Sequence, residues 1–348
     1  MDNHLKNRLL DKLHQIEKRK LLDFRVVLMH DFFVDHFLYF DEFEHSFNEI
    51  KKLYSQGGGN LPGIKQKIHQ GGNAANTALA LARLGIKPYL ICRTDEFGLH
   101  LLQYFLGREG VDLSRVKTDG KLAITTAMEY GEEHVNIMVG DTGSVSDFDF
   151  NRLDEKDLEL ISTSDIVCVL NWNLNLFGTE LADDVFRFAK KNNVKTFFDS
   201  GDPYPRKNEI PELMKNVLTG KKLDIFGLNE NELKYYSNLN IKSKEEILDA
   251  AVSLKKKISA RIDLHTSHFA CTINRKCTVI PTVKLSRIYR ETGAGDAWNA
   301  GNLFAEILGF EDDEGLLFSN IFAGQYISSP KPIHADLDEV INSIKTKS

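Results

Sequence analysis

Short apolar segments alternate with longer amphipathic segments along most of this chain, and the alternation limits the folds that the chain can adopt. The pairs are 24–29 with 74–85, 88–92 with 98–109, 166–170 with 178–193, 194–199 with 210–219, and 223–228 with 230–237. The short runs have the length of buried strands, and the longer ones have the length of helices that cover a sheet. The pattern predicts an α/β fold with a doubly wound, mainly parallel sheet flanked by helices.

Three segments fall outside this alternation. Residues 1–23 place leucines among charged residues at near-helical spacing, which predicts a helical extension ahead of an α/β domain over 24–348. Residues 31–68 are rich in aromatic and turn residues, and residues 121–139 alternate polar and apolar side chains around a turn at Gly131. The last two segments predict a small antiparallel β lid over the carboxyl ends of the parallel strands, where open α/β sheets bind ligands.

Charge and cysteine usage exclude several classes of partner. The formal net charge of −6 provides no basic field for nucleic acid or anionic lipid, so an anionic ligand must be held by local groups. The four cysteines form no C-x-x-C pair, and we expect them to be reduced. No apolar run is long enough for a membrane span, and the charged residues 1–6 lack the apolar core of a signal peptide. We expect a cytoplasmic protein without a membrane or nucleic-acid partner.

The strongest local signal is Gly293-Ala294-Gly295-Asp296, which precedes a helical apolar run. Small residues let backbone N–H groups turn inward at a helix N-terminus, where they stabilise negative charge. Donors fixed around a phosphoryl group in transfer can contribute about 3–4 kcal/mol each. Asp296, at the mouth of the same helix, can accept the proton of an attacking hydroxyl. Taken alone, the segment is equally compatible with a tight turn that Asp296 caps.

A second glycine-rich segment leads into the amphipathic stretch at 74–85. Gly71 and Gly72 bring the backbone close to a ligand, while Asn73 and Asn76 place two amides on one helical turn. This arrangement can hold a polyol. By itself, an alanine-rich helix of this kind is more typical of core packing.

The order and separation of these two segments resemble the two signatures of the PfkB/ribokinase family, and the similarity extends over residues 24–330. Residues 228–232 resemble the N-x-x-E element of the family. Residues 197–199, followed by Arg206, resemble the strand end that faces the reacting phosphate. The resemblance implies a ribokinase-like fold and a kinase that moves the terminal phosphate of a nucleotide, with Mg²⁺, to a hydroxyl of a sugar or sugar-like molecule.

The resemblance also implies roles for individual residues. Asp296 would be the catalytic base, and Gly293, Ala294 and Gly295 would form the anion hole. The acceptor residues implied are Asp35, Gly71, Gly72, Asn73 and Asn76, to which we add Asn171 and Arg93 near the ends of two predicted strands. The nucleotide residues are Asn229, Arg206, Thr266, Thr292 and Asn320, and Glu232 with Asn229 would organise Mg²⁺, largely through water. Asp31, four residues before Asp35, competes with it for the acceptor role.

Two positions depart from the family pattern. Arg290-Glu291 stands where the family commonly has Asp-Thr, whose Asp helps to hold a monovalent cation in several members, so we expect weak dependence on potassium. Side chains at 267–270 replace glycines of the nucleotide loop, which leaves the donor open between ATP and ADP. We favour ATP because it is the commoner donor in the family.

The acceptor stays open at this level. Asn171-Trp172-Asn173 suits a sugar ring or a nucleobase, whereas Arg93, Arg206 and Lys207 suit a phosphate or carboxylate. We order the acceptors as a free sugar or sugar acid, then a nucleoside, then a sugar phosphate. The apolar lid leaves open a homodimer through this part of the chain. A non-catalytic sugar-binding protein is the alternative of another class, and a dinucleotide oxidoreductase is disfavoured because no G-x-G-x-x-G follows the first predicted strand.

Overall fold

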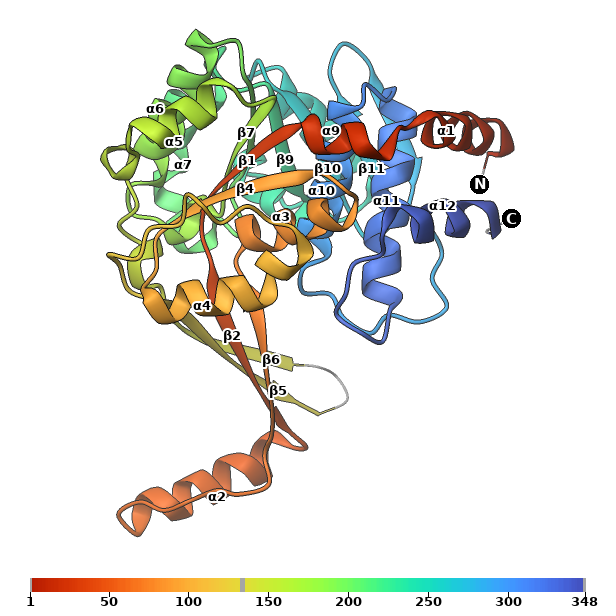
Figure 1. Cartoon of the computed structure of the whole chain (residues 1–348). Coiled ribbons are helices and arrows are strands. Elements are labelled where there is room, and N and C mark those ends of the chain that lie inside the picture. Colours follow the sequence, from red (N-terminus) through yellow and green to blue (C-terminus); the bar gives the residue numbers. More distant parts are fainter. Residues whose placement is uncertain (1, 132–134, 347–348) are drawn as a thin grey trace.

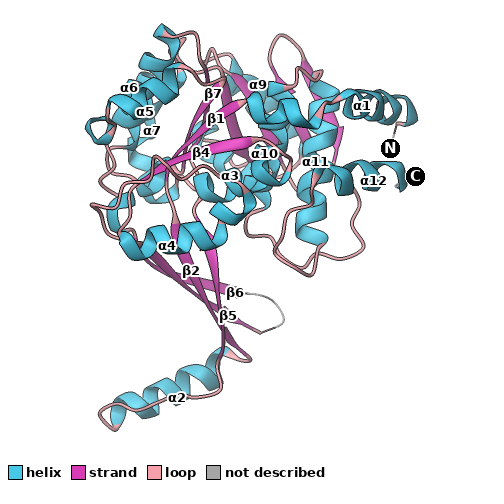
Figure 2. Ribbon diagram, in the orientation of Figure 1, coloured by secondary structure: helices cyan, strands magenta, loops and turns pink. Residues whose placement is uncertain are grey.

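The computed structural model describes residues 2–131 and 135–346, and an eight-stranded sheet forms its centre (Figures 1 and 2). Its strands are β1 (Arg25–His30), β4 (Lys87–Cys92), β7 (Ile166–Leu170), β8 (Lys195–Asp199), β9 (Ile225–Asn229), β10 (Arg261–His265), β11 (Phe269–Ile273) and β12 (Cys277–Pro281). Their order is β12-β11-β10-β9-β8-β7-β1-β4, with parallel pairing from β10 to β4 and antiparallel pairing of β11 and β12. The predicted doubly wound, mainly parallel sheet is confirmed.

Helices bury both faces of this sheet. They are α3 (Asn73–Arg83), α4 (Glu96–Phe105), α5 (Glu155–Ser162), α6 (Gly178–Lys191), α7 (Ile210–Leu213), α8 (Glu230–Ser237), α9 (Lys244–Lys255), α10 (Ala294–Ile307) and α11 (Asp312–Ser328). Along β1, Val26 and Leu28 pack in the core shared with α3, α10 and α11, while Val27 and Met29 pack in the core shared with α6 and α9. Side chains alternate between the faces of a strand, so a continuous apolar run fills two cores.

The N-terminal extension forms helix α1 (Asn3–Gln15) and a 3-10 turn over Lys18–Asp23. Leu5, Leu9 and Leu13 are buried in the core that includes residues of α11 and α12 (Leu337–Thr346). Arg8 and Lys12 of α1 make ion pairs of 3.0 and 2.6 Å with Glu314 of α11. The extension therefore packs on the body of the protein, beside α11 and α12 (Figure 1).

A second, smaller sheet forms the lid. Its strands are β2 (Phe33–Phe40), β3 (Lys65–Gly71), β5 (Ala123–Tyr130) and β6 (Val135–Asp141), in the order β3-β2-β5-β6. β2 and β3 pair antiparallel, as do β5 and β6, and a parallel pairing of β2 with β5 joins the two halves. The segment that follows the predicted turn at Gly131, residues 132–134, lies outside the described residues.

Helix α2 (Phe43–Ser55) connects β2 to β3 and projects away from the lid (Figure 1). This helix was not predicted from the aromatic and turn residues of the 31–68 segment. The signal was present, because Phe43, Phe47, Ile50 and Tyr54 recur at the spacing of one helical face.

The remaining expectations concern cysteines and membranes. Cys92, Cys168 and Cys271 are buried, Cys277 is exposed, and all four are free. None of the described helices is both long and apolar enough to cross a membrane.

Candidate active site

A cavity of about 310 Å³ lies between the lid and the carboxyl ends of the parallel strands. The lid contributes Phe33, Asp35, Thr125 and Met138, the first turn of α3 and its approach contribute Gly72, Asn73 and Asn76, and the strand ends contribute Asn171, Asp199, Asn229 and His265. Glu232 from α8 and Thr292, Gly293, Gly295 and Asp296 from the start of α10 also line it. The two predicted glycine-rich segments thus meet in one cavity.

Asp296 lies in the first turn of α10, three residues after the helix cap at Gly293, whose φ of 81° suits glycine. Its Oδ2 accepts a hydrogen bond of 2.9 Å from Nδ2 of Asn76 on α3. Burial raises the pKa of Asp296 well above its usual value, and the charge of Asp199 raises it further, while the bond from Asn76 opposes the shift. A buried carboxylate with a raised pKa is suited to accept a proton from a hydroxyl.

Free backbone amides lie beside this carboxylate. Among the described residues, the N–H groups of Gly293, Gly295 and Asp296 have no hydrogen-bond partner. The N–H of Ala294 instead donates to the carbonyl of Glu291 at 3.1 Å. The backbone amides at 293 and 295 that were predicted to form an anion hole thus lie free beside Asp296, whereas the amide of Ala294 closes the turn in this conformation.

Asp31 has a structural role at the end of β1. It accepts hydrogen bonds of 2.8 Å from the backbone N–H groups of Asn73 and Ala74 and one of 2.6 Å from Nδ2 of Asn171. It therefore fixes the first turn of α3, on which Asn73 and Asn76 lie. A side chain at Gly72 would come within 2.9 Å of its Oδ2. Asp31 thus holds Asn73 and Asn171 from outside the cavity, and Asp35 is the one that lines the cavity.

Asp35 reaches the cavity from the lid strand β2. Burial raises its pKa to about 6, with a smaller rise from the charge of Asp31 and an opposing hydrogen bond from Thr125. On the neighbouring strand β3, Gly71 leaves the space that the Asp35 carboxylate occupies, because any side chain there would overlap it.

A pH dependence follows from the raised pKa of Asp35. Its carboxylate is ionised above about pH 6 and can accept hydrogen bonds from acceptor hydroxyls only in that form. We expect the dissociation constant of the acceptor, measured by calorimetry without nucleotide, to increase as pH falls below 6. The Asp35→Asn variant should weaken this pH dependence and Asp296→Asn should retain it. The part that remains in Asp35→Asn comes from Asp31, whose pKa burial also raises to about 6. A flat profile in the wild type would remove Asp35 from acceptor binding.

The donor side of the cavity carries Asn229 and Glu232. Asn229 caps α8, its N–H and Nδ2 donate to Glu232 at 3.0 and 2.7 Å, and its Oδ1 accepts from the first turn of α8. Burial raises the pKa of Glu232 well above its usual value, and the charges of Asp199 and Asp202 raise it further. Nearby carboxylates that raise one another's pKa are stabilised by a cation. No group of three or more His, Cys, Asp or Glu among the described residues could hold a metal directly.

Two predicted arginines do not reach the cavity. Arg206 donates to the carbonyls of Trp172, Asn175 and Leu176 and to Glu209, and its guanidinium lies 4.4 Å from the Trp172 ring centre. Arg93 makes ion pairs of 3.0 and 3.2 Å with Asp119 and Asp147. Both predictions, nucleotide binding by Arg206 and acceptor binding by Arg93, are corrected: these guanidinium groups hold loops together.

Two other polar side chains that were predicted to bind the nucleotide form their hydrogen bonds within the protein instead. The Thr266 hydroxyl accepts the N–H groups of His268 and Phe269 and donates to the Phe269 carbonyl. Asn320 donates to the carbonyl of Pro281 and accepts from Nε1 of Trp298. Both are buried outside the cavity, so neither side chain is available to a nucleotide in this conformation.

The Asn171–Asn173 turn contributes the side-chain amide of Asn171 to the cavity, but no aromatic ring. Asn171 lines the cavity, whereas the fully buried Trp172 packs in the core and donates to Thr179. The tryptophan therefore does not stack on a ligand. His265, which was not among the predicted site residues, does line the cavity beside Gly295. Its place at the carboxyl end of β10 was the signal that could have identified it.

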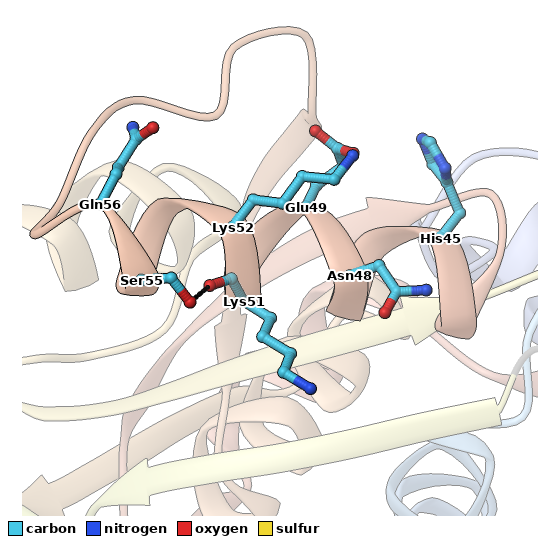
Figure 3. A pocket seen from close by; sticks show the side chains of 7 residues that line it. All are labelled: His45, Asn48, Glu49, Lys51, Lys52, Ser55 and Gln56. Carbon is cyan, nitrogen blue, oxygen red and sulfur yellow. Dashed lines mark hydrogen bonds and ion pairs between the residues drawn. The ribbon is translucent and has the colours of Figure 1, made fainter.

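A separate hollow lies on the projecting helix α2. Seven polar side chains line it (Figure 3): His45, Asn48, Glu49, Lys51, Lys52, Ser55 and Gln56. These residues come from one helix and the residue after it, far in the sequence from the strand ends and helix N-termini that surround Asp296. We therefore assign the candidate active site to the cavity beneath the lid.

Comparison with known proteins agrees with this geometry. The family model of the pfkB family carbohydrate kinases matches residues 39–338. The chain belongs to the pfkB family of carbohydrate kinases. A 5-dehydro-2-deoxygluconokinase of Clostridium beijerinckii is 26% identical over 272 residues, which cover 76% of this chain and 79% of that protein. The ribokinase of Haemophilus influenzae is 25% identical over 284 residues, which cover 78% of this chain and 85% of that protein.

Solved structures of the pfkB family share the fold. Arabidopsis thaliana ribokinase, complexed with ribose and ATP, superimposes with a TM-score of 0.76 over 93% of this chain and 99% of that chain at 19% identity. The adenosine kinase of Sinorhizobium meliloti superimposes with a TM-score of 0.74 over 92% and 98% of the two chains at 16% identity. The predicted ribokinase-like fold and the assignment as a carbohydrate kinase are confirmed.

Proposed function

We propose that this pfkB-family kinase transfers the terminal phosphate of ATP to a hydroxyl of a sugar or sugar-like acceptor, with Asp296 as the general base. The observation that carries the proposal is the position of Asp296. It shares the N-terminus of α10 with unpaired amides and is hydrogen-bonded to Asn76 of the acceptor wall. A protein that only binds sugar does not need a base beside an anion site.

The residues divide the reaction between them. Asp35, Asn73 and Asn171 hold acceptor hydroxyls, and Asp296 takes the proton of the hydroxyl that attacks the terminal phosphorus. The new bond joins the acceptor oxygen to that phosphorus, the bond to the bridging oxygen of the nucleotide breaks, and ADP leaves. The amides of Gly293 and Gly295 offset the negative charge on the phosphoryl oxygens during transfer.

Glu232, Asp199 and Asp202 fit a magnesium ion on the donor side. Their charges disfavour one another, and they form no direct cage, which suits a Mg²⁺ that keeps several waters and binds the nucleotide phosphates. When bound, the ion supplies positive charge to the phosphates. Asn229 would fix the orientation of Glu232 through its two hydrogen bonds.

ATP is the proposed donor, in line with the nucleotide bound to the Arabidopsis ribokinase. The test is a panel of sugars, sugar acids, nucleosides and sugar phosphates assayed with Mg²⁺ and with ATP and ADP in parallel. The proposal requires transfer to at least one sugar-like compound with ATP. Transfer with ADP alone would contradict the choice of donor. Thermal stabilisation by a sugar without any transfer would instead favour the binding protein.

Potassium should have little effect on this enzyme. Nη1 of Arg290 donates to the carbonyls of Tyr326 and Ser329 at 2.7 Å each, which places a fixed positive charge just before the anion hole. Because that charge already stands near the site, we expect exchange of sodium for potassium to change turnover by less than about twofold. A large increase in turnover when potassium replaces sodium would contradict this role for Arg290.

We also propose a homodimer through the lid. Phe43, Phe47, Ile50 and Tyr54 of α2 are between 42% and 84% exposed, and the stripe continues into an apolar hollow lined by Tyr130, Val135 and Ile137. A helix of 13 residues is marginal in water unless its apolar face is covered. Acidic residues at 41–44 and lysines at 51–52 lie at opposite ends of α2, so two copies related by a twofold axis pair opposite charges.

Light scattering after size exclusion tests the dimer. Phe47→Asp should give a monomer, because it places a charge inside the apolar stripe. His45→Asp, on the polar face shown in Figure 3, is the matched control and should remain a dimer. A monomeric wild type would contradict the proposal.

The cytoplasmic location expected from the sequence stays a prediction.

A further inference from the structure

Cationic side chains lie beyond Asp35 on the face of the lid that meets the cavity. Asp35 lines the cavity from β2, and residues paired directly opposite one another on a sheet share a face. Asp35 pairs with His69, Phe37 with Lys67 and Tyr39 with Lys65. The side of the lid that carries Asp35 therefore also carries His69, Lys67 and Lys65.

Arg290 meets this cluster from the main domain. It precedes Gly293 of the anion hole by three residues. Burial lowers the pKa of His69, and the charges of Lys67 and Arg290 lower it further, which indicates that both cations lie near the ring. The charge of Arg290 also acts on Tyr39, whose ring lies 5.7 and 5.6 Å from Nζ of Lys65 and Lys67.

The guanidinium of Arg290 is held in place, but only one of its nitrogens donates hydrogen bonds among the described residues. Its Nη1 donates to two backbone carbonyls, and the group lies 5.3 Å from the centre of the Tyr326 ring. Among the described residues, Nε and Nη2 have no hydrogen-bond partner and Arg290 has no ion pair. That open edge has the geometry that binds a carboxylate or phosphate in bidentate fashion, and the anchored group loses little freedom when it does so.

A neutral sugar carries no anionic group that these cations could bind. Asp35, Asp296 and the amides at 73, 76 and 171 already supply partners for hydroxyl groups. Arg93 and Arg206, the cations expected to bind an anion, are occupied elsewhere. Glu129, opposite Tyr39, lies farther toward the lid tip than Lys67 and His69. Within the described part of the chain, Arg290 and Lys67 are therefore the cations that act on His69 and have no ion pair.

We propose that the acceptor carries an anionic group, a carboxylate or a phosphate, and that Arg290 and Lys67 bind this group beside His69. The proposal rests on the kinase function proposed above and narrows its substrate class. The hydroxyl to be phosphorylated lies at Asp296, other hydroxyls face Asp35, and the anionic end faces the lid cations. Arg290 and Lys67 are specificity residues that take no part in proton transfer.

Paired acceptors test the proposal. Aldonates of four to six carbons are compared with the matching alditols, and pentose and hexose monophosphates with the matching free sugars, all with ATP and Mg²⁺. The wild type should prefer the anionic member of at least one pair by roughly tenfold or more in kcat/KM. The pair that shows the preference distinguishes a carboxylate from a phosphate. Equal rates with both members of every pair would overturn the proposal.

Variants separate the subsite from the catalytic machinery. Lys67→Gln should lower kcat/KM for the anionic acceptor by roughly ten- to a hundredfold, mostly through KM, and change the neutral member by less than about threefold. Arg290→Gln should lower the preference for the anionic member over the neutral member by the same factor. Arg287→Gln is the matched control, because Arg287 is an exposed arginine of the same loop that lies over the Tyr289 ring. An effect of Arg290→Gln on the nucleotide KM with unchanged acceptor discrimination would place Arg290 on the donor side and overturn the proposal.

Failure of the subsite and failure of the kinase function give different results. If neutral sugars are phosphorylated and the variants do not alter discrimination, the subsite is wrong and the kinase function stands. If no compound is phosphorylated, the kinase function fails. The thermal shift then decides: stabilisation of the wild type by an anionic compound, lost in Arg290→Gln, supports the subsite, and its absence overturns it.

Discussion

Asp296→Asn should lower single-turnover phosphoryl transfer by roughly 10²–10⁴, the usual contribution of a general base. Acceptor binding should persist, because the amide oxygen can still accept the hydrogen bond that Asn76 donates. The thermal midpoint of the variant at pH 8 should exceed that of the wild type. The reason is that burial and the charges of Asp199, Asp31 and Asp35 all disfavour the ionised carboxylate in the folded protein.

The two readouts together distinguish chemistry from folding. Asp312→Asn, at the start of α11, makes the same change of charge outside the cavity and should leave turnover unaltered. Near-normal transfer by Asp296→Asn would remove Asp296 from the chemistry. Loss of transfer together with a lowered midpoint would show that the carboxylate supports the fold instead.

Asp31→Ala should destabilise the protein by about 3 kcal/mol or more and raise the KM for the acceptor at least roughly tenfold. The substitution leaves the N–H groups of Asn73 and Ala74 and the amide of Asn171 without their acceptor in a buried region. The first turn of α3 and the end of β7 then lose the group that holds them together. Denaturant unfolding and steady-state kinetics measure the two effects.

Two variants calibrate this result. Ser243→Ala removes the cap of α9, far from the cavity, and should cost about 1 kcal/mol without a change in KM. Asp31→Asn keeps one acceptor oxygen and should fall between the wild type and Asp31→Ala. Wild-type stability and KM in Asp31→Ala would contradict the role given to Asp31.

The position of the candidate site around Asp296 could be predicted from the sequence because its determinants are local. Gly293–Asp296 and Gly71–Asn76 are short segments that combine a glycine turn with the first turn of a helix, and the parallel sheet brings both turns to one edge. Asn229 and Glu232 are likewise a single capping box. In such segments, the same few residues determine both the backbone geometry and the functional groups.

Long side chains could not be predicted in the same way. Arg206 is held by carbonyls some 30 residues earlier in the chain, and Arg93 by Asp119 and Asp147 on later loops. Whether an arginine points into a cavity depends on these distant partners, which the local sequence does not reveal. For the same reason the sequence drew attention to Arg290 only as an unusual residue before the motif. That Nε and Nη2 of Arg290 are free among the described residues depends on the carbonyls of Tyr326 and Ser329, which bind Nη1 and lie far from Arg290 in the sequence.

The lid is joined to the main domain by very short connections. β2 follows β1 after Asp31 and Phe32 alone, and β3 reaches α3 through Gly72 alone. Any tilt of the lid must therefore turn the backbone at Asp31 and at Gly72, the two points that hold the first turn of α3. A tilt of the lid about these two points would also move the polar wall of the cavity, so that closure over a ligand and alignment of Asn76 with Asp296 would be coupled.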